Sequence, residues 1–218
     1  MVLDGLVDLL RRRSPLPDQS EFPRLNPILN DYRFPFSILT DSHLEQALTP
    51  SRVDAIREAL IHPDCSGDVE IRYQVPWDAG SVIHPGTVDV VFSQAVLEHV
   101  DDIAACYAAM AAWLKVGGYA SHQIDFSSHD LAPEWNGHWS CSRPVWNIIR
   151  SGLPYLLNRA PCSAHETLLA RNGLIVIARV PRIQENGLKR DQIRREFQQL
   201  TDDDLVTAGA YLLARKCA

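Results

Sequence analysis

The sequence predicts an α/β fold organised around one strand–helix–strand unit. Residues 88–92 are almost all apolar, which is typical of a strand that is central in its sheet and covered on both faces. Apolar side chains then recur at helical spacing over residues 103–114, and Gly117 and Gly118 suit a left-handed helix end. Residues 119–124 form the next predicted strand. A connection of this length joins parallel strands through a right-handed crossover.

The composition is that of an ordinary globular chain. Of its 218 residues, 27 are acidic and 21 basic, and the net charge of -6 gives no electrostatic reason to bind nucleic acid. No apolar run approaches the ~20 residues that span a bilayer, so no membrane association is predicted. The five cysteines are scattered without a C-x-x-C pair, and no signal peptide precedes them. Reduced thiols and a cytoplasmic location are therefore expected.

The chain is predicted to divide into two parts. Residues 1–66 are expected to form a helical and proline-rich cover, with helices at 2–13 and 49–61. Residues 67–218 are expected to form the α/β core, with a loop-rich insertion at about 126–160.

Further elements of the core follow from local patterns. Strict alternation over residues 68–75 predicts a half-buried strand near a sheet edge. Ser163 and Glu166 have the spacing of a capping box that opens a helix. The other expected elements are strands at 174–180 and 205–216 and an amphipathic helix at 189–200.

The first candidate for chemistry is the segment that follows the apolar strand. Ser93, Gln94 and Ala95 stand where the backbone leaves the sheet, and small side chains and amides at such a place can line a ligand pocket. Glu98 and His99 come just afterwards. They either belong to the same pocket or only cap and orient the coming helix.

The second candidate is a polar run at the end of the next strand. His122, Asp125 and His129 offer two imidazoles and a carboxylate, which suit general acid–base catalysis. The same groups are legitimate zinc or iron ligands, but their spacing matches no known ligand motif, so no metal site is predicted. A hydrogen-bonded histidine pair without a catalytic role is an equal alternative.

The third candidate lies in the insertion. Exposed tryptophan rings could stack on a sugar, and the guanidinium of Arg159 could bind an anionic group. The alternative is that the tryptophans form a small core of the insertion itself. The candidate substrate-binding residues are Trp146, Asn158 and Arg159.

Residues 88–100, with the helix and Leu114–Gly118 that follow, resemble the fourth-strand region of class I S-adenosylmethionine-dependent methyltransferases. The segment 121–129, the pair Asn158–Arg159 and the segment 203–205 make the chain similar to a bacterial, type 11-like branch of that family. The likeness covers roughly residues 68–216. It implies a Rossmann-like sheet that is mostly parallel, with an antiparallel C-terminal strand.

The resemblance also implies a function and a cofactor. Methyl transfer is an in-line displacement at a sulfonium carbon, and the protein supplies alignment and often a base. The expected cofactor is S-adenosylmethionine and the expected acceptor is a small molecule or a sugar. The family's pattern places Ser93, Gln94 and Ala95 beside the methionine end of the cofactor, Pro76 and Trp77 beside the adenine, and His122, Asp125 and His129 beside the acceptor.

One departure from the family pattern is clear. The family carries a glycine-rich turn after its first strand, and no G-x-G occurs in this chain. The sheet is therefore expected to be incomplete at its N-terminal side, with an open strand edge that a second copy or a partner chain could cover. A truncated, weak or inactive methyltransferase is the expectation. The alternatives are a non-catalytic α/β module and a metal-dependent hydrolase that uses His122, Asp125 and His129.

Overall fold

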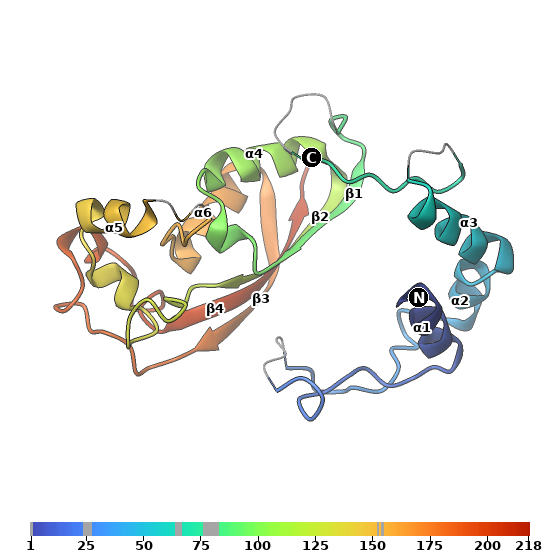
Figure 1. Cartoon of the computed structure of the whole chain (residues 1–218), viewed down its shortest axis with the longest axis horizontal. Helices are drawn as coiled ribbons and strands as arrows, with labels where there is room; N and C mark the ends of the chain where they lie inside the picture. The colour runs from blue at the N-terminus through green and yellow to red at the C-terminus, as the bar shows by residue number, and fades with distance from the viewer. Residues whose placement is uncertain (1, 24–27, 64–66, 76–82, 152, 154) are drawn as a thin grey trace. The chain divides into compact units, whose positions relative to one another are not determined.

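The computed structural model describes residues 2–23, 28–63, 67–75, 83–151, 153 and 155–218. The chain divides into two compact units, Met1–Ala79 and Gly80–Ala218 (Figure 1). Each unit is described by itself.

The first unit is helical where it is regular. Thr40 caps the second of its helices by accepting a hydrogen bond from the N–H of His43. Arg57 donates to Asp4 over 2.8 Å and so ties the third helix to the first. The helices are α1 (Val2–Arg11), α2 (Asp41–Ala47) and α3 (Pro50–Ile61), and the sequence predicted the first and third of them.

The strand predicted at residues 68–75 is not formed. This stretch has no regular secondary structure, and most of its side chains are exposed. A strand is stable only when a neighbour accepts and donates its backbone hydrogen bonds. Within the described residues no strand lies beside this segment, so alternation alone was a wrong guide here.

The second unit is built on a four-stranded sheet in the order β1-β2-β4-β3. Strands β1 and β2 are parallel, whereas β4 is antiparallel to both β2 and β3. Three strands therefore run one way and the C-terminal strand runs against them, as the sequence predicted. The strands are β1 (Val88–Gln94), β2 (Leu114–Asp125), β3 (Leu174–Ile183) and β4 (Thr207–Lys216).

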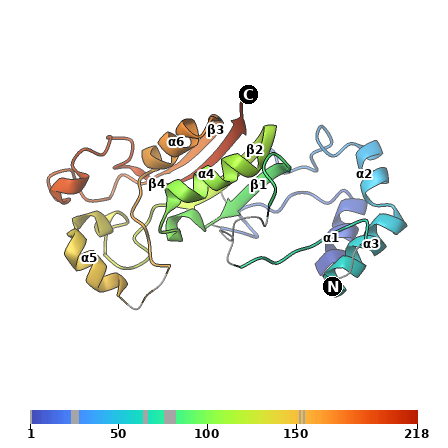
Figure 2. The ribbon, with the colours of Figure 1, turned by 90° about the horizontal axis from the view of Figure 1, so that it is seen from above.

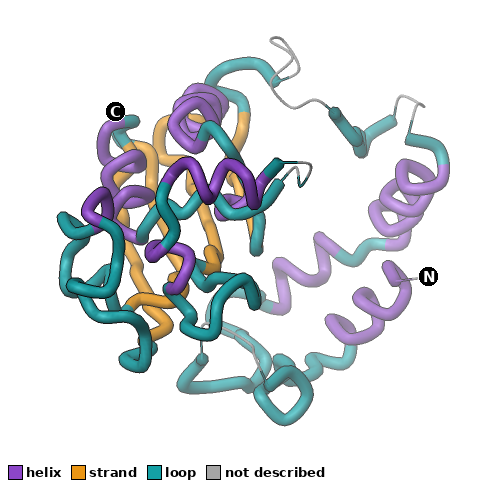
Figure 3. Tube along the Cα trace, turned by 60° about the vertical axis from the view of Figure 1, so that its left-hand side comes forward, coloured by secondary structure: helices purple, strands orange, loops and turns teal. Residues whose placement is uncertain are grey.

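Two helices cover one face of this sheet. Helix α4 (Ile103–Trp113) is the crossover between β1 and β2, and α6 (Cys162–Arg171) packs beside it (Figures 1 and 2). Side chains alternate along a strand, so every second residue of β2 and β4 points under these helices and is buried. The shorter elements are η1 (Leu97–His99), η2 (Gly137–Ser140), α5 (Arg143–Arg150) and η3 (Arg195–Phe197). Figure 3 shows helices, strands and loops in separate colours.

The prediction that residues 88–92 form a central strand covered on both faces is wrong. Within the described residues β1 pairs with β2 alone and is an edge strand. The side chain of Phe92 is 79% exposed and that of Val90 is 54% exposed. Both project from the face opposite α4, where Tyr119, Ile175 and Val180 are also exposed. An apolar run reports a preference for burial, but it cannot supply the elements that would bury it.

Residues 189–200 form no amphipathic helix and contain only the single turn η3. Tertiary hydrogen bonds hold the backbone in another path. Arg190 donates to the carbonyls of Gln198 and Leu200, and the N–H of Arg194 donates to the carbonyl of Trp139. Helix propensity is a weak preference that such contacts override.

The capping box predicted at Ser163 and Glu166 is replaced by a cap from outside the helix. The buried carboxylate of Asp204 accepts hydrogen bonds from the N–H of Ser163 over 2.9 Å and from its hydroxyl over 2.7 Å. It also accepts from the N–H and the hydroxyl of Thr201. Glu166 instead pairs with Arg179. One carboxylate therefore joins the start of α6 to the approach to β4.

Asp204→Ala should lower the free energy of unfolding by about 2–3 kcal/mol, because it removes a helix cap and leaves buried donors without an acceptor. Urea unfolding monitored by circular dichroism measures the loss. The matched control is Asp202→Ala, which removes an exposed carboxylate two residues away that pairs with Arg190 and should leave stability essentially unchanged. Equal effects of the two substitutions would show that Asp204 is not the cap that α6 depends on.

Candidate functional site

The carboxyl ends of the parallel strands β1 and β2 meet at one edge of the sheet. Ser93 Oγ lies 2.8 Å from His122 Nδ1 at this edge. The next turn begins at Ala95, whose φ of 51° is left-handed and whose N–H donates to the carbonyl of Gln123 over 3.0 Å. The side chain of Gln94 is exposed between them. Ligands of open α/β sheets bind at such an edge.

Asn158 holds the short turn η1 that follows β1. Its side-chain amide donates to the carbonyls of Leu97 and Val100 over 2.7 and 2.8 Å. Its own N–H donates to the carbonyl of Glu98 over 2.8 Å. Asn158 therefore satisfies the backbone of the turn and has little left to offer a substrate.

The turn presents Glu98 and His99. Glu98 is only 3% exposed, and neither of its carboxylate oxygens has a hydrogen-bond partner among the described residues. Burial raises the pKa of Glu98, an effect that nearby backbone N–H groups partly oppose. His99 Nδ1 lies 2.7 Å from the carbonyl oxygen of Tyr155, which fixes the ring and makes Nδ1 the protonated nitrogen.

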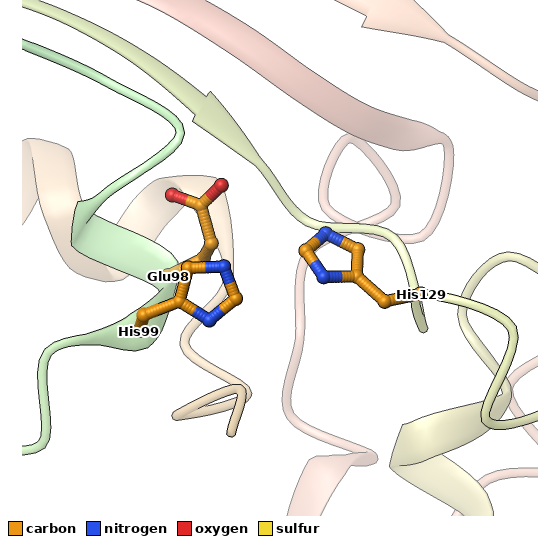
Figure 4. A group of neighbouring side chains, drawn as sticks. All are labelled: Glu98, His99 and His129. Atoms are coloured by element: carbon orange, nitrogen blue, oxygen red, sulfur yellow. The ribbon is translucent and has the colours of Figure 1, made fainter. Parts of the chain in front are cut away.

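Asp125 and His129 face this turn from the end of β2. One carboxylate oxygen of Asp125 accepts from the N–H of Ser127 over 2.8 Å and from Arg182 over 2.7 Å. The other lies 3.7 Å from His129 Nε2. The rings of His129 and His99 are 5.3 Å apart, and Figure 4 shows the His129 ring facing the neighbouring side chains of Glu98 and His99.

His122 belongs to a different environment from Asp125 and His129. It projects under the helices and is fully buried, whereas Asp125 comes from the opposite face of β2, because residues three apart on a strand point to opposite sides. Desolvation lowers the pKa of His122 to about 4, so it is neutral at physiological pH. The three residues predicted as catalytic therefore do not converge. The hydrolase hypothesis, which needs all three on one metal, has no support from this geometry.

A buried polar cluster lies beneath the edge. Tyr107 of α4 packs edge-on against His122, and its hydroxyl lies 3.0 Å from Nδ1 of His165 in α6. Desolvation lowers the pKa of His165 to about 3. The cluster joins both covering helices to the strand that ends at the site.

The tryptophans of the insertion are a core and not an exposed stacking surface. The rings of Trp135 and Trp139 are 5.7 Å apart, and Trp146 is also buried. The guanidinium of Arg159 lies 4.9 Å from the ring centre of Trp146 and donates to the carbonyl of Cys141 over 2.8 Å. Trp146, Asn158 and Arg159 thus have structural contacts of their own.

The remaining predicted residues, Pro76 and Trp77, lie outside the described residues. The sequence indicated Glu98 and His99 only as neighbours of the pocket or as helix-orienting groups. The feature of the sequence that could have indicated them is their position. They follow one strand of the parallel pair, and His129 follows the other. Within the described residues, no helix is long and apolar enough to cross a bilayer.

A comparison with known protein families finds a match that includes β1 and η1. Residues 67–121 match a methyltransferase domain family. No curated protein sequence matches the chain. The resemblance to a methyltransferase domain is thus confirmed for the segment that ends inside β2.

Several solved structures are similar to the chain at low identity. A methyltransferase in complex with the Haloferax volcanii Trm112 methyltransferase activator is 12% identical, with 63% of this chain and 57% of that chain covered and a TM-score of 0.39. Phosphoethanolamine N-methyltransferase 2 of Haemonchus contortus is 15% identical, with 62% and 35% covered and a TM-score of 0.39. Geranyl diphosphate C-methyltransferase of Streptomyces coelicolor is 15% identical, with 62% and 49% covered and a TM-score of 0.37. The chain spans less than two thirds of each of these proteins.

The buried histidines predict a loss of stability in acid. The pKa of His165 is lowered in the folded state, so the unfolded chain binds more protons between pH 6.5 and about 3, and stability falls as the pH drops through that window. His165→Gln should remove about 2 kcal/mol of the stability lost between pH 7 and pH 5. Urea unfolding across this range measures the slope.

The matched control is His43→Gln, which changes an exposed histidine of α2 and should keep the wild-type pH dependence. An unchanged slope in His165→Gln would contradict the neutral state assigned to the buried ring.

Proposed function

We propose that the chain serves S-adenosylmethionine-dependent methyl transfer to a small-molecule acceptor at the carboxyl edge of β1 and β2. The observation that carries the proposal is that the family match and the polar residues of the edge lie in the same part of the chain. The methyltransferase-domain match at residues 67–121 includes β1 and its turn, and the polar residues of the edge follow directly from these strands. Ser93, Gln94 and Ala95 are proposed to border the methionine end of the cofactor.

On the acceptor side, Asp125 and His129 have complementary roles in this proposal. His129 is exposed at the edge and can take the acceptor's proton. Asp125, held by Arg182, lies close enough to stabilise the imidazolium that forms. His122 acts differently, as a positioning residue that fixes the hydroxyl of Ser93 from below.

In this proposal the described residues build only part of the cofactor's site. The hydroxyl of Ser93 is engaged by His122, and the N–H of Ala95 is engaged by the carbonyl of Gln123. The chain also has no G-x-G turn to receive the rest of the molecule. We propose that a second copy or a partner chain at the open edge of β1 completes the cofactor side.

The acceptor is proposed as a small molecule on the grounds of the polar side chains beside His129. The argument for a sugar depended on exposed tryptophan rings, and the burial of Trp146 removes that support. What remains beside His129 is a carboxylate and a second imidazole, which suit an acceptor with a hydroxyl or amino group.

Residues 1–218 alone should bind S-adenosylmethionine weakly, with a Kd above about 100 μM, or about −5.5 kcal/mol. Isothermal titration calorimetry measures the affinity. At high ligand concentration, ¹H–¹⁵N correlation spectra should show shifts at the amides of Ser93, Gln94 and Ala95, which ATP should not reproduce because it lacks the methionine part.

Two results would contradict the proposal in different ways. Low-micromolar binding would show that this chain holds the cofactor without a second chain. If saturating S-adenosylmethionine leaves the amide signals of residues 93–95 unchanged, the cofactor does not bind at this edge.

A further inference from the structure

We infer that Glu98, His99 and His129 form a binding site for a divalent transition-metal ion. Each side chain offers one ligand atom, and the three atoms lie within 4.8 Å of one another. Glu98 and His99 come from the turn η1 and His129 from the loop after β2, so the cluster joins the ends of both parallel strands (Figure 4). All three belong to the unit Gly80–Ala218.

His99 is oriented as a metal ligand. The carbonyl of Tyr155 accepts the Nδ1 proton over 2.7 Å, so the lone pair of the neutral ring is on Nε2. Metal-binding histidines ordinarily donate their other ring N–H to a carbonyl or carboxylate in this way. The residue that holds the ring, Tyr155, has a left-handed φ of 67°. Such backbone strain persists only where the surrounding structure enforces it.

Glu98 gives an independent reason to expect a cation. Its carboxylate is buried, and both oxygens lack a hydrogen-bond partner among the described residues. A buried carboxylate without a partner is costly, whether it stays charged or becomes protonated. A metal ion between Glu98 and the imidazoles would satisfy the oxygens and neutralise the charge.

His129 completes the set from the other side. Two successive residues, His129 and Asp130, have left-handed φ values of 49° and 62°, and this bend turns the imidazole back toward η1. Asp125 lies 3.7 Å from Nε2 of the ring, within reach of an electrostatic contact. His129 is exposed, so an ion here would keep open positions for water or for an oxygen of a small ligand.

The ligand set selects the class of metal. Two imidazoles and one carboxylate suit Zn²⁺, Fe²⁺ or Co²⁺, whereas Mg²⁺ and Ca²⁺ prefer oxygen ligands throughout. This inference does not rest on methyl transfer. It would deepen that function, because an ion beside the acceptor could bind its hydroxyl oxygen and make the hydroxyl proton easier to release to solvent. His129 would then serve as a metal ligand and not as the base. Metal binding is measured without cofactor or acceptor, so the two proposals fail separately.

The test is titration of the full, metal-free chain with Co²⁺, followed by displacement with Zn²⁺. Wild-type protein should bind one equivalent and develop the visible d–d absorption of a protein-bound, low-coordinate cobalt. His99→Ala, His129→Ala and Glu98→Gln should each weaken binding by about tenfold to a hundredfold or more. His84→Ala is the control, since it removes an exposed histidine of the same unit and should leave the titration unchanged.

Far-UV circular dichroism of each metal-free variant checks the fold. His129→Ala carries the test even if Glu98→Gln fails to fold, because His129 is exposed. The inference is overturned if the wild-type chain shows no cobalt spectrum at equimolar metal. It is equally overturned if folded His129→Ala and His99→Ala bind cobalt as tightly as wild type.

Discussion

The hydrogen bonds of Asn158 are the constraint on which the candidate site depends. A single 3₁₀ turn has too few internal hydrogen bonds to be stable alone, and η1 has only three residues. Asn158 occupies the carbonyls of Leu97, Glu98 and Val100, and its own side-chain oxygen accepts from the N–H of Ala160. A residue from the far end of the insertion therefore fixes the turn that follows β1. The polar side chains of that turn are held in place before any ligand arrives.

The direction of the strands explains why polar side chains gather where β1 and β2 end. Because β1 and β2 are parallel, both end at the same side, and the loops that follow them must meet. Successive side chains of β2 point to opposite faces of the sheet, so its polar residues are divided between the two faces. His122 is buried under α4 and becomes part of a neutral, packed cluster, whereas Asp125 emerges at the open side with His129. Residues close in sequence thus serve stability and chemistry separately.

Much of the fold could be predicted from local patterns, because they coincide with tertiary structure in this part of the chain. The large apolar side chains of α4 recur at helical spacing, and buried residues alternate with less buried ones over Ala210–Arg215 of β4. The glycine cap predicted for α4 is wrong, because the helix ends at Trp113 and Gly117 and Gly118 lie inside β2. Segments whose partners decide the outcome were predicted wrongly. Residues 68–75 alternate but have no neighbouring strand among the described residues, and residues 189–200 are held in loops by Arg190 and Trp139.

The site was harder to predict because its geometry depends on long-range contacts. The sequence located His129 and Asp125 correctly at one strand end, but it could not show that His122 points to the other face. The neighbouring sequence does not show that the carboxylate of Glu98 lacks a hydrogen-bond partner among the described residues, because this depends on which parts of the fold surround it. The role of the tryptophans could not be decided from the sequence for the same reason. Their burial in the structure shows that they form a core of the insertion.

Hydrogen exchange of the Asn158→Ala variant tests the central claim, that Asn158 holds the turn in the conformation that builds the site. Mass spectrometry should find exchange at residues 96–100 faster by about tenfold or more, because the turn opens locally, while β2 and β4 keep their protection. Unchanged exchange in the turn, or a uniform increase over the whole sheet, would contradict the claim.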